Sequence, residues 1–188
     1  MELVLILIGV LIVVGAAVVY LTATYNRLVN LRALVDNSWS NIDTELKRRY
    51  DLIPNLVRTV QGYARHEKEV LDRVVQARRQ AMQSTGSPSS QAQDENVLVG
   101  ALRGVFAVVE GYPQLKASSH FQALQDELVN TEDRIQAARR FYNGNVKDLN
   151  TLIGQVPSNL IARQYAFQPV EFFEIDNVFE RQPVAVKY

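Results

Sequence analysis

The stretch "ELKRRYDLIPNLVRTVQGY", Glu45–Tyr63, decides the fold, because it places a proline inside a strongly periodic helical pattern. Apolar residues recur three and four positions apart on both sides of Pro54, without a change of phase. A helix that stopped and restarted would have no reason to keep that phase. We therefore predict one helix with a kink at Pro54, where the missing N–H frees the Tyr50 carbonyl at a cost of about 3 kcal/mol. The alternative is a new helix with Asp51 as its N-cap and Pro54 in its first turn.

The same spacing extends in both directions and predicts one long helix over residues 35–81 that packs against other helices. Arg49 and Glu67 are the two positions of the pattern that are not apolar. We expect Arg49 to pair with an acid such as Glu127 or Glu132 on a later helix and so to specify register. The alternative is that its side chain reaches solvent at the rim of the bundle. The repeating positions are Val35, Trp39, Ile42, Leu46, Arg49, Ile53, Leu56, Val60, Tyr63, Glu67, Val70, Val74, Ala77 and Ala81.

The remainder of the chain also reads as helical. Residues 83–96 are rich in Ser and polar residues and contain Gly and Pro, so they are predicted to form a loop. A second helix follows and should end or bend at Tyr112-Pro113, because the residue before a proline is disfavoured in helical geometry. A third helix is expected to start at Ser118 or Ser119, and a short fourth helix to follow Pro157. Helices joined by short loops pack antiparallel, so the expected fold is an all-α, up-down helical bundle.

An extended tail, residues 168–188, is predicted to follow the last helix. Its sequence "EFFEID" contains Phe172 and Phe173, which we expect to fold back onto the bundle. The alternative is that they are presented to a partner chain.

The N-terminus is predicted to contact the lipid bilayer. Residues 3–23 include no charged side chain and, as a helix rising about 1.5 Å per residue, would cross a hydrocarbon core of about 30 Å. The competing interpretation is a secretory signal, but such signals have a basic region before a shorter apolar run, and here only Glu2 precedes it. We therefore divide the chain into a transmembrane anchor, residues 1–24, and a helical-bundle domain, residues 25–188.

The residues that flank the apolar run predict its orientation. Arg27 and Arg32 follow it closely and no basic residue precedes it. The positive-inside rule then places the N-terminus outside and the C-terminal domain in the cytoplasm, with one crossing of a bacterial inner membrane.

Composition argues against several kinds of chemistry. Twenty basic and twenty acidic residues balance, which gives no reason to expect a nucleic acid partner, and the absence of cysteine excludes thiolate chemistry. His66 begins a zinc-protease pattern but has Val70 where the second histidine should stand. We expect no metal, no cofactor and no enzymatic activity. The alternative is a cryptic hydrolase that folding assembles from Arg49, Asp51 and Glu132.

The chain resembles the LemA family of bacterial membrane proteins. The residues that carry this likeness are "SWSNIDTELKRRYDLIPNLVRTVQGYARHEKEVLDRVVQAR", "EGYPQLKA", "FQALQDELVNTEDRIQAARRFYN", "PSNLIA" and "FFEI". The resemblance implies a single-pass anchor with a helical bundle and no established reaction, cofactor or catalytic residue. It also suggests a membrane metalloprotease or another envelope protein as a partner, through gene neighbourhood alone.

These features together lead us to expect a membrane-anchored scaffold that self-associates or binds envelope proteins. A protein that remodels the bilayer is the alternative, although no long basic amphipathic face supports it. The residues expected to make the interaction surround the proline and include one acid of the third helix: Arg48, Arg49, Asp51, Pro54, Asn55 and Glu132.

Overall fold

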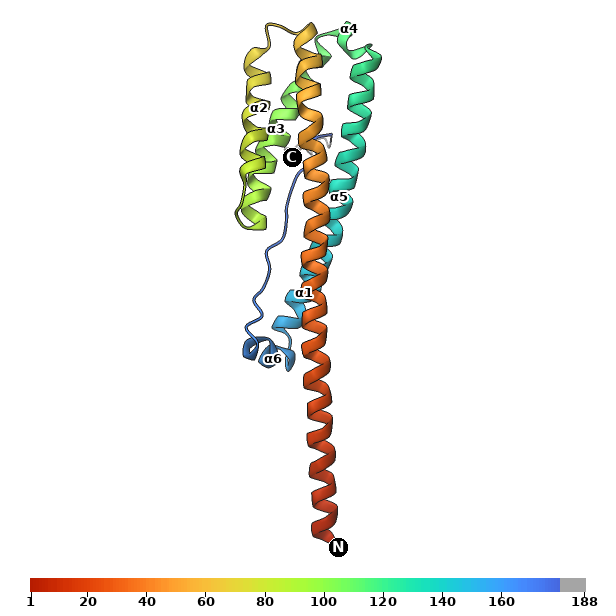
Figure 1. Cartoon of the computed structure of the whole chain (residues 1–188), viewed down its shortest axis with the longest axis vertical. Helices are drawn as coiled ribbons and strands as arrows, with labels where there is room; N and C mark the ends of the chain where they lie inside the picture. The colour runs from red at the N-terminus through yellow and green to blue at the C-terminus, as the bar shows by residue number, and fades with distance from the viewer. Residues whose placement is uncertain (180–188) are drawn as a thin grey trace, which may run out of the picture. The chain divides into compact units, whose positions relative to one another are not determined.

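The computed structural model describes residues 1–179, and within them every regular element is a helix, so the predicted all-α class is confirmed. Figure 1 labels the helices in chain order. Their bounds are α1 Glu2–Tyr63, α2 Lys68–Gln83, α3 Pro88–Glu110, α4 Pro113–Lys116, α5 Ser119–Gly154 and α6 Ser158–Gln164.

The chain forms two compact units, and α1 and α5 each contribute to both of them. Unit 1 consists of Met1–Ser38 and Asn143–Val170. Unit 2 consists of Trp39–Tyr142 and the residues from Glu171 onward, which are described to residue 179.

Helix α1 runs through Pro54, as the unbroken phase predicted, so the alternative of a new helix capped by Asp51 is wrong. The carbonyl of Tyr50, which loses its helical donor to the proline, accepts a hydrogen bond from Nε of Arg78 on α2 at 2.7 Å. A side chain of the neighbouring helix therefore satisfies the acceptor that proline leaves open. The kink itself stays a prediction.

The predicted single helix over residues 35–81 is wrong, because α1 ends at Tyr63 and α2 begins at Lys68. The short turn between them lets α2 pack back beside the unit 2 part of α1 (Figure 1). Tyr63, the last residue of α1, is exposed, whereas Ala64 in the turn and Leu71 on α2 are buried. Three-and-four spacing cannot distinguish a continuous helix from a helical hairpin, since each helix of a hairpin has the same period.

The predicted loop over residues 83–96 is also wrong in extent, because α3 starts at Pro88. Ser87 is the N-cap, its hydroxyl accepts a hydrogen bond from the N–H of Ser90, and Pro88 occupies the first turn, where its missing N–H is harmless. The first two turns are polar because only Ala92 and Glu95 of them reach the core. Polar composition here reflects a solvent-facing helix surface.

The later helix boundaries agree with the sequence. Helix α3 ends just before Tyr112-Pro113, α5 starts at Ser119, and α6 follows Pro157. Helices α2 and α3 lie side by side in unit 2 and run antiparallel, as their short connection predicted (Figure 1).

The tail folds back onto unit 2 as far as it is described. Phe173 is fully buried and packs edge-on against Trp39, with ring centroids 5.3 Å apart, whereas Phe172 is exposed. The side chain of Asn96 on α3 holds the tail backbone at two points: it donates to the carbonyl of Glu174 at 3.1 Å and accepts from the N–H of Asp176 at 2.8 Å. The rest of the predicted tail, residues 180–188, lies outside the described residues.

Candidate functional site

A buried ionic cluster links three helices of unit 2 around Arg49. The guanidinium of Arg49 on α1 is fully buried and donates to Glu132 on α5 at 2.8 Å and to Glu95 on α3. The hydroxyl of Tyr50 donates to the other oxygen of Glu95. The predicted pairing of Arg49 with Glu132 is therefore confirmed, and the alternative of an arginine reaching solvent is wrong.

Burial and charge act in opposite directions on the members of this cluster. Burial disfavours the charged guanidinium of Arg49, but Glu132 and Glu95 outweigh that effect and raise its pKa above the usual value. Burial raises the pKa of Glu95 even though Arg49 and Tyr50 favour its ionised form. Burial and the neighbouring Glu95 also raise the pKa of Tyr50, which keeps its phenol protonated as a donor. One cation thus faces two acids, and Glu95 is the acid that burial makes easier to protonate.

The raised pKa of Glu95 predicts a pH effect on stability. A group whose folded-state pKa is raised stabilises the fold fully below its unfolded pKa, about 4.3, and loses that contribution as pH rises through the folded-state value. The wild type should therefore lose stability relative to Glu95→Gln as pH increases from about 4, by roughly 1.4 kcal/mol for each unit of pKa shift.

Urea unfolding of the two full-length chains in detergent micelles, followed by circular dichroism from pH 4 to 8, measures this difference. Titration of other groups cancels because both chains carry them. A difference that stays constant, or that favours the wild type more at higher pH, would contradict the predicted direction.

The cluster does not have the arrangement of an accessible catalytic site. Arg49 and Glu132 are sealed from solvent, while Asp51 is exposed on α1, so the three residues of the hydrolase alternative do not converge on a cleft. Within residues 1–179, no group of three or more His, Asp or Glu side chains is placed to hold a metal ion. The arrangement joins α1, α3 and α5 at one height. That it specifies the register of these helices stays a prediction.

The other predicted interaction residues remain on the surface of α1. Arg48 is partly exposed, and its guanidinium nitrogen lies 3.8 Å from a carboxylate oxygen of Glu45. The side-chain oxygen of Asn55 accepts a hydrogen bond from Arg58 at 2.5 Å. Pro54 is half-buried. Of the six residues, the structure brings together Arg49 and Glu132.

Sequence reasoning missed Glu95 and Tyr50. A signal for Glu95 exists, because the buried face of α3 continues backwards from Leu98 by three residues to Glu95 and by three more to Ala92. An acid at a core position of one helix and an arginine at a core position of another predict a pair. The signal was lost because the segment was assigned to a loop.

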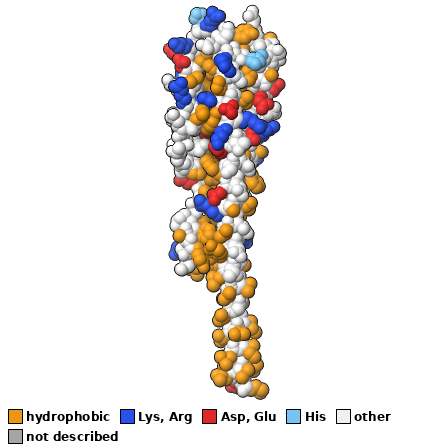
Figure 2. All heavy atoms as spheres, viewed as in Figure 1, with side chains coloured by type: hydrophobic (Ala, Val, Ile, Leu, Met, Phe, Trp, Pro, Cys, Tyr) orange, Lys and Arg blue, Asp and Glu red, His pale blue; other side chains and the backbone are white. Residues whose placement is uncertain are grey.

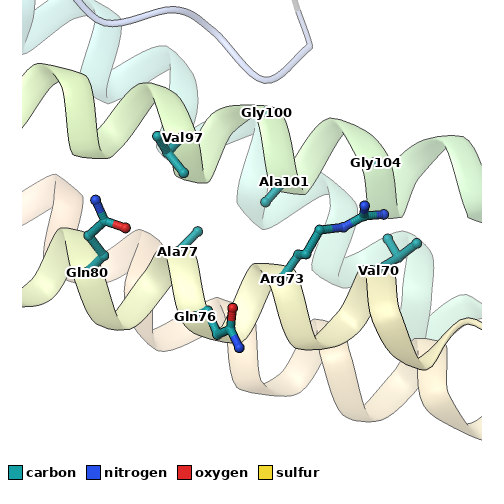
Figure 3. Close-up of a pocket in the computed structure, with 9 residues that line it drawn as sticks. All are labelled: Val70, Arg73, Gln76, Ala77, Gln80, Val97, Gly100, Ala101 and Gly104. Atoms are coloured by element: carbon teal, nitrogen blue, oxygen red, sulfur yellow. The ribbon is translucent and has the colours of Figure 1, made fainter.

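A groove of about 410 Å³ runs along the surface between α2 and α3. Figure 3 shows Arg73, Gln76 and Gln80 on the α2 side, and Gly100 and Gly104 on the α3 side, where the missing side chains leave space. No acid, histidine or hydroxyl lines this groove. It offers surface for contact and no convergent set of reactive groups.

One helix of residues 1–179 is long and apolar enough to cross a membrane, and it is α1. Its most apolar stretch has no side chain buried in the protein. The apolar surface predicted for residues 3–23 is therefore available to lipid along its whole length.

Comparison with known proteins places these features in a family. The chain is similar to magnetosome protein MamQ of Magnetospirillum gryphiswaldense, 25% identical over 183 residues that cover 84% of this chain and 67% of that protein. It is similar to magnetosome protein MamQ 2 of Paramagnetospirillum magneticum, 27% identical over 195 residues, with 90% and 71% covered. It is also similar to protein LemA of Metamycoplasma hominis, 27% identical over 156 residues, with 81% and 70% covered.

The sequence profile of the LemA family matches residues 38–188, which include all of unit 2 and the whole ionic cluster. The apolar N-terminal stretch lies before the matched range, so its resemblance to the family rests on the sequence pattern alone. Since the match extends over most of the chain, this protein belongs to the LemA family.

Proposed function

We propose that this chain is a single-pass, membrane-anchored helical scaffold that self-associates or binds other envelope proteins through unit 2. Two features of α1 together carry the proposal. Its N-terminal part is a fully exposed apolar stretch. The same helix continues into unit 2, where Arg49 forms buried ion pairs with Glu95 and Glu132. A helix of this kind partitions into lipid. Because Arg49, Glu95 and Glu132 are engaged with one another inside unit 2, its outer helix faces are the surfaces that can contact a partner. Relatives named for a cellular structure, the magnetosome, support a structural role.

The proposed location is a bacterial inner membrane, with the N-terminus outside and both the ionic cluster and the tail on the cytoplasmic side. Arg27 and Arg32 on the C-terminal side of the apolar stretch support this orientation. A membrane metalloprotease or another envelope protein is a possible partner by family analogy, and a second copy of the chain is the partner that can be tested directly.

The chain contains no cysteine, so single-cysteine variants can map contacts without background. We would place one cysteine at Val97 on α3 and, separately, one at Phe141 on α5, both exposed, and treat native membranes with a bifunctional maleimide. A scaffold should give adducts of defined mass whose yield depends on position. The matched control is the same variants diluted into excess detergent, where random collisions become rare and adducts persist only where the contact is stable.

If every cysteine position gave only monomer, the scaffold proposal would be contradicted.

The same variants report orientation, because a membrane-impermeant maleimide should label Val97→Cys in inverted vesicles and not in intact spheroplasts. The opposite labelling would reverse the proposed topology while leaving the scaffold role open to the cross-linking result.

A further inference from the structure

Unit 1 carries an apolar surface next to the anchor that the scaffold role does not use. Val156, in the turn before α6, is 81% exposed, and Leu160 on α6 is 64% exposed. Tyr165, which directly follows α6, is also exposed. Figure 2 shows hydrophobic side chains gathered over this part of the molecule. Large aliphatic side chains this exposed in one small region are typical of a contact surface.

The buried face of α6 fixes the orientation of its exposed face. Ile161 and Ala162 are buried, so α6 has one face packed inside unit 1 while Leu160 points away from it. The ring of Tyr25 on α1 lies 4.6 Å from that of Tyr165 and 6.2 Å from that of Phe167. Aromatic contacts therefore fasten the segment after α6 to α1 just beyond the apolar stretch.

The position along α1 identifies the occupant of this surface. A groove of about 380 Å³ is lined on the α1 side by residues that start at Leu21, within the apolar stretch, and end at Asn26, and on the other side by Leu160 and Tyr165. Ala23, the last residue of the apolar stretch, is on the order of 3 Å along the helix from Leu21, given a rise of about 1.5 Å per residue. The groove is thus continuous with the lipid-facing surface and lies where the helix leaves the hydrocarbon.

Charge and residue type around the groove fit a lipid headgroup region. No acidic residue occurs in residues 155–170, and Arg163 is the basic residue there. On α1, Arg27 and Arg32 follow the apolar stretch, and Nε of Arg32 lies 3.4 Å from a carboxylate oxygen of Asp36. Tyrosine is favoured at membrane–water interfaces because its ring is apolar and its hydroxyl remains wet. An arginine at the same depth can reach anionic headgroups.

We propose that Val156, Leu160 and Tyr165 form a second membrane contact, in which α6 lies against the headgroup region of the bilayer beside the anchor and lipid occupies the groove. This inference rests on the proposed anchoring of α1 in the membrane. It gives the C-terminal end of unit 1 a fixed depth in the bilayer, which the anchor alone does not specify.

Depth-dependent quenching tests the contact in the full chain. Single cysteines at Val156 and at Leu160 are labelled with an environment-sensitive fluorophore, and the protein is placed in vesicles of phosphatidylcholine and phosphatidylglycerol. Nitroxide lipids that carry the spin label on the headgroup or deep on the acyl chain then report depth. Labels at both positions should show blue-shifted emission, and the headgroup nitroxide should quench most of their fluorescence intensity.

Two matched positions separate the possible outcomes. Met82 on α2 is an exposed apolar residue like Leu160, at 51% against 64%, and a label there should stay water-like and unquenched. A label at Leu11 should be quenched by the acyl-chain nitroxide. If Leu11 is not quenched, the proposed anchoring itself fails.

If Leu11 is quenched while Val156 and Leu160 behave like Met82, anchoring stands and the second contact is overturned. The second contact would also be overturned if the label at Leu160 showed blue-shifted emission that neither nitroxide lipid quenched and that increased with the ratio of protein to lipid. In that case a second copy of the chain would cover the surface.

Discussion

Replacing Arg49 by methionine is expected to lower the free energy of unfolding of unit 2 by about 3–5 kcal/mol, the cost of leaving buried carboxylates without their cation. Glu95 and Glu132 are both buried, and the guanidinium of Arg49 pairs with both of them. The methionine side chain fills much of the same volume, so the loss measures charge more than packing.

Arg48→Met is the matched control, because Arg48 is the next residue of the same helix and its side chain is partly in solvent. Its effect should remain within about 0.5 kcal/mol. Urea unfolding of full-length chains in detergent micelles gives both values. The emission of Trp39, the single tryptophan, reports on unit 2, since its ring packs against Tyr142 at 5.2 Å between centroids. Equal effects of the two substitutions would show that the cluster contributes nothing as an ion pair.

A triple variant separates the role of the charges from that of the fold. In Arg49→Met/Glu95→Leu/Glu132→Leu, every charge of the cluster is replaced by an apolar group. Buried ion pairs often stabilise no better than apolar residues of similar size. In addition, Nε of Arg49 and one oxygen of Glu132 make no hydrogen bond to residues 1–179. We expect this variant to regain most of the stability that Arg49→Met loses, apart from about 1–3 kcal/mol for the buried hydroxyl of Tyr50, which loses its acceptor Glu95.

Phe173→Ala is expected to lower the free energy of unfolding of unit 2 by about 3–5 kcal/mol, the usual cost of removing a fully buried phenylalanine. The tail residue Phe173 packs against Trp39 of α1, and Ile175 beside it is also buried. The tail has no regular secondary structure there, so no helix or strand hydrogen bonds hold it in place once the ring is removed. The tail should detach and the emission of Trp39 should shift to the red.

The neighbouring Phe172 supplies the control. It is exposed, so Phe172→Ala should change stability by less than about 1 kcal/mol and leave Trp39 emission unchanged. Circular dichroism follows global unfolding independently of the tryptophan. If Phe173→Ala unfolds at the same urea concentration as Phe172→Ala, the tail does not form part of the core.

The helical class and much of the cluster could be predicted without coordinates. Helical spacing is a local property, so it revealed the apolar faces of α1, α3 and α5 and the unbroken phase through Pro54. An arginine at a core position requires an acid, and Glu132 was within the predicted choice. The carbonyl of Tyr50 was likewise predicted to lose its helical donor to Pro54, and Arg78 donates to it.

The remaining features depend on contacts between residues distant in sequence. The turn after Tyr63 was missed because a helix and a helical hairpin have the same period, and only packing of α2 against the rest of unit 2 distinguishes them. Glu95 was missed because the polar start of α3 resembles a loop, although Ala92 and Glu95 face the core.

Local patterns therefore determined which segments of this chain are helical, which stretch can enter a membrane, and that Arg49 needs a buried counterion. The tertiary structure decided which acids meet that arginine, where the first hairpin turns, and that Leu160 is exposed beside the anchor. The reason is physical: helical periodicity depends on neighbours within a few residues, whereas an ion pair across three helices, or an apolar surface that remains uncovered, depends on how the helices pack.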